Sequence, residues 1–134
     1  MKYPLDVNAL IALGIKQHEH NLRIETWIAE FPKQSRPNFA TCSITELGFV
    51  RIVSQVSAYS FTLEDARNEL LQLKQTKILN FSFIPDGNDI SNLPAWVKSH
   101  KQATDGHLAQ LAKSNEALLA TLDENISGSF LIPK

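Results

Sequence analysis

The chain has 134 residues, which is enough for one domain with its own hydrophobic core and too few for two ordinary domains. Hydrophobic residues make up 43% and charged residues 20%, which is ordinary globular usage and excludes a disordered or fibrous chain. The formal net charge of -1 excludes a whole-molecule field that would draw the protein to nucleic acid or to an anionic membrane.

The expected elements alternate between short apolar runs and longer segments with helical spacing. Residues 3–5 form an apolar strand that ends at Asp6, and Asn8 is the expected N-cap of a helix that ends at Gly14. The tetrapeptide Thr-Leu-Glu-Asp at 62–65 is a capping box and predicts the start of another helix. The other expected elements are a helix over 21–31, a strand over 39–44, a helix carrying residues 47–53, a continuation of the capped helix to 74, a strand over 78–84, a turn over 86–89, one helical turn near 93–97, a helix over 104–114 and strands over 117–122 and 130–132.

Strands that alternate with helices predict an α/β fold, a three-layer α/β/α sandwich with a mostly parallel central sheet, over residues 1–134 as a single domain. The single cysteine, Cys42, lies in an apolar run, so we expect a buried structural thiol and a cytoplasmic protein without disulfides. No apolar run approaches the roughly 20 residues that a membrane span needs. The N-terminus also carries Asp6 and Asn8 too early for a secretory signal.

Four acidic residues fall where the expected strands end, or where a helix begins facing the same edge. Asp6 follows the first strand, Glu46 lies just past the second, and Asp123 closes the strand expected over 117–122. Asp105 opens the helix that leads into that strand. Ligands of open parallel sheets bind outside the carboxyl ends of the strands, so we expect the four carboxylates to converge there.

Helical spacing places two of these acids on apolar faces. Glu46 shares a face with Phe49 and Val53, and Asp105 shares one with Leu108. Asp105 also lies in a first helical turn, where the macrodipole favours the ionised form. Burying an unpaired carboxylate is costly, and no obvious set of arginines lies nearby, so a divalent cation is the expected partner. Oxygen ligands select Mg²⁺ or Mn²⁺ over zinc.

Each acid also has a purely structural interpretation. The segment 43–46, Ser-Ile-Thr-Glu, fits a capping box in which Glu46 serves its own helix. Asp6 could cap the first helix, Asp105 could be an exposed acid favoured by the dipole, and Asp123 could belong to a polar turn. The convergence of all four at one edge favours a shared site over four separate roles.

Four segments carry a family resemblance. LDVNALIAL has an aspartate after the first strand and a small polar residue two positions later, and CSITELGFVRIV carries Glu46. HKQATDGHLAQLA carries Asp105 after Thr104, and LLATLDENI carries Asp123. In this order, over nearly the whole chain, the segments resemble the motifs of PIN-domain ribonucleases, especially VapC-like toxins of type II toxin–antitoxin pairs. The third segment is the most specific.

The resemblance implies a metal-dependent endoribonuclease that acts as a toxin, with Mg²⁺ or Mn²⁺ held by Asp6, Glu46, Asp105 and Asp123. Asp6 and Asp105 are the expected direct ligands. Glu46 and Asp123 could bind metal directly or through water, or Asp123 could instead orient the attacking water. Some relatives carry a further aspartate after the fourth acid, where this chain has Asn125, so the resemblance leaves open whether one or two metals bind. The residues expected to orient the carboxylates are Asn8, Thr104 and Asn125.

The resemblance also implies an RNA substrate, a separate VapB-like antitoxin and a homodimer. Lys98, Lys101 and Arg51 are candidates for binding RNA phosphates, with solvated side chains as the alternative. The His-Glu-His segment at 18–20 is a solvated loop in our interpretation, because zinc sites require three or four ligands.

Two other classes of function deserve comparison. A haloacid-dehalogenase-type phosphatase needs a second aspartate two residues after the first, and Asn8 occupies that position. A non-catalytic PIN-like module that binds RNA or protein is the stronger alternative. The presence of all four acids argues against it, and hydrolysis that stops with EDTA would separate the two.

Overall fold

The computed structural model describes residues 1–134 and has alternating strands and helices as its main elements. Four short 3-10 helices, η1 to η4, cover Lys33–Ser35, Ser57–Tyr59, Ile90–Asn92 and His100–Gln102. No helix is both long enough and apolar enough to cross a membrane. The main elements in chain order are β1 Lys2–Pro4, α1 Val7–Gly14, α2 Asn21–Ala29, β2 Asn38–Thr41, α3 Ser43–Gln55, α4 Leu63–Gln75, β3 Asn80–Phe83, α5 Ala103–Ser114, β4 Ala120–Thr121 and β5 Phe130–Leu131.

The strands form one parallel layer in the order β3, β2, β1, β4, β5. β1 and β3 flank β2 in parallel, and β4 pairs with β5 in parallel. A parallel bridge between Leu5 and Ala120, with the backbone N–H of Asp6 donating to the Ala120 carbonyl at 3.3 Å, joins the two groups. The expected parallel sheet is therefore confirmed, and the carboxyl ends of β1, β2 and β4 lie at the same edge.

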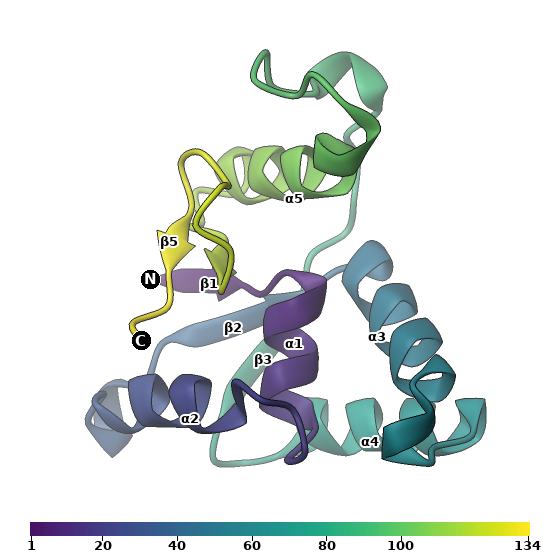
Figure 1. Cartoon of the computed structure of the whole chain (residues 1–134). Helices are drawn as coiled ribbons and strands as arrows, with labels where there is room; N and C mark the ends of the chain where they lie inside the picture. Colours follow the sequence, from purple (N-terminus) through teal and green to yellow (C-terminus); the bar gives the residue numbers. More distant parts are fainter.

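Helices cover both faces of this sheet. In Figure 1, α5 lies on one side of the strands and α1 to α4 lie on the other. The side chains of β2 alternate accordingly, because Phe39 packs with Trp27 and Phe49 in the larger core, whereas Ala40 packs with Leu108 in the smaller one. The three-layer α/β/α architecture expected from the sequence is confirmed.

Several boundaries differ from those expected. The first helix is capped by Asp6 rather than by Asn8. The second strand ends at Thr41 rather than continuing to 44, because the hydroxyl of Thr45 accepts a hydrogen bond from the backbone N–H of Cys42 at 3.0 Å and α3 begins at Ser43. The capping box at this helix is therefore formed by Cys42 and Thr45, and the proposed capping role of Glu46 was wrong.

Other expected elements are shorter than the sequence suggested. The third strand pairs only over Asn80–Phe83 and the fourth only over Ala120–Thr121. Near 93–97 there is a single turn, closed by the Val97 N–H donating to the Pro94 carbonyl at 3.1 Å, with 3-10 helices before and after it. The capping box that opens α4 is confirmed, since Thr62 and Asp65 exchange two hydrogen bonds of 3.0 Å.

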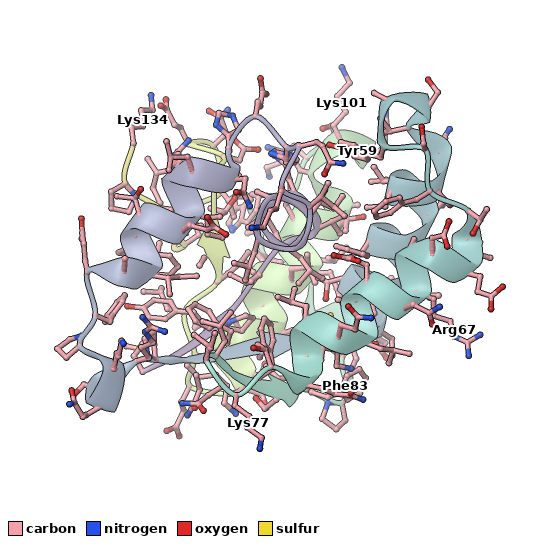
Figure 2. All side chains as sticks on the ribbon, turned by 90° about the horizontal axis from the view of Figure 1, so that it is seen from below. Tyr59, Arg67, Lys77, Phe83, Lys101 and Lys134 are labelled. Carbon is pink, nitrogen blue, oxygen red and sulfur yellow. The ribbon has the colours of Figure 1, made fainter.

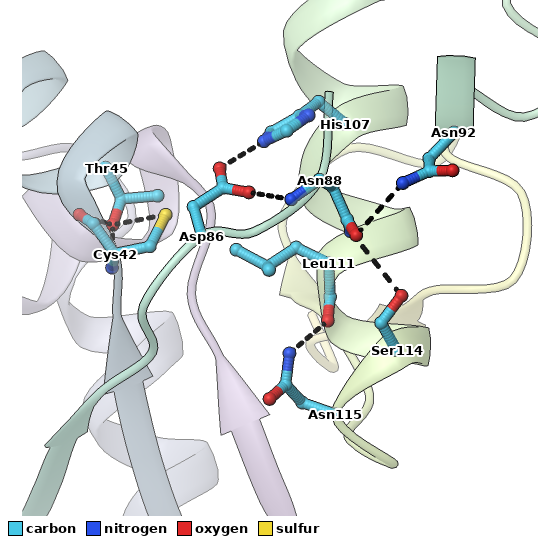
Figure 3. Close-up of polar contacts among 9 residues, drawn as sticks. All are labelled: Cys42, Thr45, Asp86, Asn88, Asn92, His107, Leu111, Ser114 and Asn115. Carbon is cyan, nitrogen blue, oxygen red and sulfur yellow. Dashed lines mark hydrogen bonds and ion pairs between the residues drawn. The ribbon is translucent and has the colours of Figure 1, made fainter. Parts of the chain in front are cut away.

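The connection from β3 to α5 is tied onto α5 by polar contacts (Figure 3). His107 Nε2 contacts the carboxylate of Asp86, and Asp86 Oδ1 accepts the backbone N–H of Asn88 at 3.0 Å. The amide of Asn88 in turn reaches the hydroxyl of Ser114 at 3.4 Å. Asp89, another acidic residue of this segment, caps η3 by accepting a hydrogen bond from the backbone N–H of Ser91. These contacts fix the segment against the helix that carries Asp105.

Candidate active site

Asp6 is the most buried acid of the chain, with 5% of its surface exposed. Its Oδ1 accepts the backbone N–H of Ala9 at 2.8 Å, and its Oδ2 accepts the hydroxyl of Thr121. Burial raises the pKa of Asp6 to about 6, although the hydrogen bonds from Thr121 and Ala9 oppose the shift and the charges of Asp105 and Asp123 add to it. Asp6 therefore caps its helix and also faces two other carboxylates.

Asp105 and Asp123 complete this acidic cluster, which we define as Asp6, Asp105 and Asp123. Asp105 lies in the first turn of α5. Burial is the main cause that raises its pKa, and the negative charge of Asp123 is the second. Asp123 follows β4, and its backbone N–H donates to the Thr121 hydroxyl at 3.0 Å. None of the three carboxylates forms an ion pair with a lysine, arginine or histidine.

The acidic cluster has the donor chemistry of a site for a hard divalent cation. All its donors are carboxylate oxygens, which suit Mg²⁺ or Mn²⁺, and a shared cation would offset the negative charges that help to raise the pKa of Asp6 and of Asp105. No three acidic or histidine side chains are yet as close together as the ligands of one metal ion. The residues therefore fit such an ion by type and charge.

The hydrogen-bond and ion-pair partners of Glu46 lie outside the acidic cluster. Its Oε2 accepts the hydroxyl of Thr41 at 2.6 Å and the Nζ of Lys74 at 2.5 Å. It is not among the charges that shift the pKa of Asp6 or Asp105. The metal-ligand role that the sequence assigns to Glu46 stays a prediction, and in this metal-free structure a lysine of α4 pairs with its carboxylate.

The three residues expected to orient the carboxylates have different surroundings in the metal-free structure. Asn8 is exposed, and its Oδ1 contacts His18 Nε2 at 3.0 Å rather than a carboxylate. Thr104 is exposed without a side-chain hydrogen bond, while the backbone N–H of Asn125 donates to Asp123 Oδ1 at 2.9 Å. In the segment 18–20, His18 packs beside His20, with ring centroids 5.8 Å apart, and no third ligand joins them.

Two buried threonines at strand ends donate hydrogen bonds to acids of the candidate site. Thr121, with 0% of its surface exposed, bonds to Asp6, and Thr41, with 1% exposed, bonds to Glu46. Sequence reasoning missed both. The available signal was their position, because each is a hydroxyl residue at the carboxyl end of a strand next to an expected acid.

The candidate RNA-binding side chains Lys98, Lys101 and Arg51 are all exposed. Figure 2 shows Lys101 extending from the edge of the molecule. None of the three forms an ion pair within the chain. Lys98 and Lys101 immediately precede α5, the helix that carries Asp105, so binding of RNA phosphates beside the acidic cluster stays a prediction.

A parallel sheet between two helical layers, with clustered carboxylates at its carboxyl edge, defines a nuclease domain of the PIN type. The fold is that of a solved relative, the VapC20 Sarcin-Ricin loop cleaving toxin of Mycobacterium tuberculosis. The comparison gives a TM-score of 0.57 with 9% identity, over 93% of this chain and 92% of the other.

Sequence relatives identify the family, although no family model matches the chain. Ribonuclease VapC38 of Mycobacterium tuberculosis is 35% identical over 128 residues, covering 91% of this chain and 85% of the relative. Ribonuclease VapC29 of the same organism is 33% identical over 124 residues, with coverages of 92% and 86%. Ribonuclease VapC44 is 32% identical over 132 residues, with coverages of 95% and 89%. The chain therefore belongs to the VapC family.

Proposed function

We propose that this protein is an endoribonuclease that requires Mg²⁺ or Mn²⁺ and acts as the toxin of a toxin–antitoxin pair. The observation that carries the proposal is Asp6, a buried carboxylate with a pKa near 6 that faces two further carboxylates and no basic side chain. Such a group is costly without a cation, so its arrangement is better explained by metal binding than by stability. The family membership supplies RNA as the substrate class.

Each side chain of the site has a defined task in this proposal. Asp6 and Asp105 are direct metal ligands, and Asp123, which is exposed at the rim, binds the metal or orients the attacking water. Thr121 orients Asp6, and the orienting roles expected of Asn8, Thr104 and Asn125 stay predictions. A bound divalent cation supplies a hydroxide nucleophile at neutral pH and stabilises negative charge on the phosphoryl oxygens.

The proposed partners follow from the family and from the surface. RNA phosphates would contact Lys98, Lys101 and Arg51, and the protein would be a cytoplasmic homodimer silenced by a separate antitoxin. A groove of about 430 Å³ between α3 and α4 supports a protein partner on the helical surface. Leu47 and Leu63 both line it and are 67% and 59% exposed, so the groove presents apolar surface to solvent.

The direct test is cleavage of a mixed tRNA and rRNA pool by the purified protein with Mg²⁺ or Mn²⁺, beside EDTA and an Asp105→Asn variant. We expect cutting that EDTA and the substitution both abolish. Asp89→Asn is the matched control, because Asp89 is an exposed acid that caps η3 outside the acidic cluster. Cutting that persists in EDTA or in Asp105→Asn would contradict the proposal, and metal-independent RNA binding without cutting would favour a binding module.

A further inference from the structure

Lys74 and Glu46 form an ion pair between the last turn of α4 and the first turn of α3. The Nζ of Lys74 lies 2.5 Å from Glu46 Oε2, and the Thr41 hydroxyl donates to the same oxygen at 2.6 Å. The two side chains are 24% and 26% exposed, so the pair is partly withdrawn from solvent. Oε2 is thus engaged by two donors, and no hydrogen bond reaches Oε1.

Lys74 is itself held from a second side. Its Nζ lies 5.5 Å from the centroid of the Phe83 ring at the end of β3, within the range of a cation–π contact. In Figure 2 the Phe83 side chain lies beside α4, whereas Lys77 extends away from the molecule. The ammonium group therefore has a defined position between an aromatic ring and a carboxylate, unlike a solvated surface lysine.

This position matters because Glu46 lies at the same sheet edge as the acidic cluster. Thr41, its other partner, ends β2, the strand next to the one that leads into Asp6. The carboxylate could add a further negative charge to the cluster, yet it is neutralised by Lys74 and contributes no charge effect at Asp6 or Asp105. The fourth acid of the site is present in the fold but turned to another partner.

We propose that Lys74 is a positioning residue that holds Glu46 away from the acidic cluster, so that a divalent cation bound there competes with Lys74 for this carboxylate. The proposal rests on the proposed metal-dependent function. Its consequence is that the ion pair lowers the affinity of the site for metal. Removing the charge of Lys74 frees Glu46 to join the three aspartates as a ligand.

The test is Mn²⁺ binding to the metal-free, full-length protein, measured by titration calorimetry without RNA. We expect Lys74→Met to bind Mn²⁺ about tenfold more tightly than wild type, a coupling typical of residues in direct contact. Lys74→Arg keeps the charge and should bind as wild type does. Lys77→Met is the matched control, because Lys77 is exposed and forms no ion pair.

A double-mutant cycle separates positioning from a merely structural effect. If Lys74 acts through Glu46, Lys74→Met has no effect on Mn²⁺ affinity in a Glu46→Gln background. An effect that persists there, or weaker binding in the single variant, would overturn the proposal. Lys74→Gln replaces Lys74→Met if the latter loses its far-UV circular dichroism spectrum.

The same titration distinguishes failure of this inference from failure of the proposed function. If Asp105→Asn abolishes Mn²⁺ binding while Lys74→Met leaves it unchanged, only the role of Lys74 is overturned. If wild type binds no Mn²⁺, or binds it equally well after Asp105→Asn, the metal site and the role of Lys74 are overturned together.

Discussion

The hydroxyl of Thr121 donates to the Oδ2 of Asp6 across 115 residues of sequence. The same hydroxyl oxygen accepts the backbone N–H of Asp123 at 3.0 Å. One fully buried side chain thus connects two members of the acidic cluster and fixes the orientation of the most buried one. The link joins the edge after β1 to the end of β4, which is where the two halves of the sheet meet.

We therefore predict that Thr121→Val weakens Mn²⁺ binding by about 10- to 100-fold, the usual cost of losing a group that orients a ligand. The substitution keeps the shape of the side chain but leaves the carboxylate of Asp6 without its hydroxyl donor. Thr121→Ser keeps the hydroxyl and should retain most of the affinity. The measurement is calorimetric titration of both variants with Mn²⁺, and equal affinities of Thr121→Val and wild type would refute the orienting role.

We also predict that Asp6→Asn stabilises the metal-free protein at pH 7. The native pKa of Asp6 is raised to about 6, so between about pH 4 and pH 6 the native state holds a proton that the unfolded state has released. The free energy of unfolding therefore falls as pH rises through this window, by about 3 kcal/mol in total. The contribution of Asp6 to stability is complete only below the window. Asparagine has no charge to bury, so the stability of the variant should not fall in this pH window. Weaker hydrogen bonds from Ala9 and Thr121 to asparagine offset part of this gain.

Urea unfolding in EDTA at several pH values between 4 and 7.5 checks this prediction. The difference between wild type and Asp6→Asn isolates the contribution of this residue from those of other titrating groups. Adding Mg²⁺ should reverse the order at pH 7, because the ion stabilises only the chain that binds it. A variant that is less stable than wild type at pH 7 in EDTA would show that Asp6 serves mainly as a helix cap.

The sequence predicted the sheet edge well because strand ends can be recognised locally. Asp6, Asp105 and Asp123 each follow an apolar run or open a helix, and in a parallel sheet such positions must share one edge. The family motifs agree with this reasoning independently. The parallel orientation of the strands and the three layers followed from the alternation of strands and helices along the chain.

The partners of the acids could not be predicted in the same way, because they depend on packing between distant elements. Lys74 reaches Glu46 only because α3 and α4 pack with the last turn of one beside the first turn of the other. A helical pattern gives the face that a residue occupies but not the residue across from it. The side chain of Asn8 likewise bonds to His18, which a following loop brings back to it.

The contact between His107 and Asp86 provides a further prediction, about local order. The two side chains are 16% and 18% exposed, and they tie the segment after β3 to α5 (Figure 3). His107→Ala should cost about 1 kcal/mol of stability and raise hydrogen exchange in residues 86–102, because local openings follow lost contacts. His100→Ala, which removes an exposed histidine of the same segment, is the control. Equal exchange in the two variants would contradict the tethering role.

The last prediction concerns Gly106, which directly follows Asp105 in α5. A Cβ at this position would overlap Cγ2 of Val97. Alanine favours a helix over glycine by about 1 kcal/mol, whereas overpacking costs about 1–3 kcal/mol, so Gly106→Ala should be net destabilising if Val97 cannot move. The displaced turn should also weaken Mn²⁺ binding, because it carries Asp105.

Val97→Ala separates the steric effect from other causes. The double variant Gly106→Ala/Val97→Ala has room for the new methyl group, so it should recover Mn²⁺ affinity relative to Gly106→Ala alone. Urea unfolding and titration with Mn²⁺ measure the two effects on the same samples. If Gly106→Ala matches wild type in stability and in Mn²⁺ affinity, the side chain of Val97 moves aside without displacing α5. In that case the segment before this helix does not fix the position of Asp105.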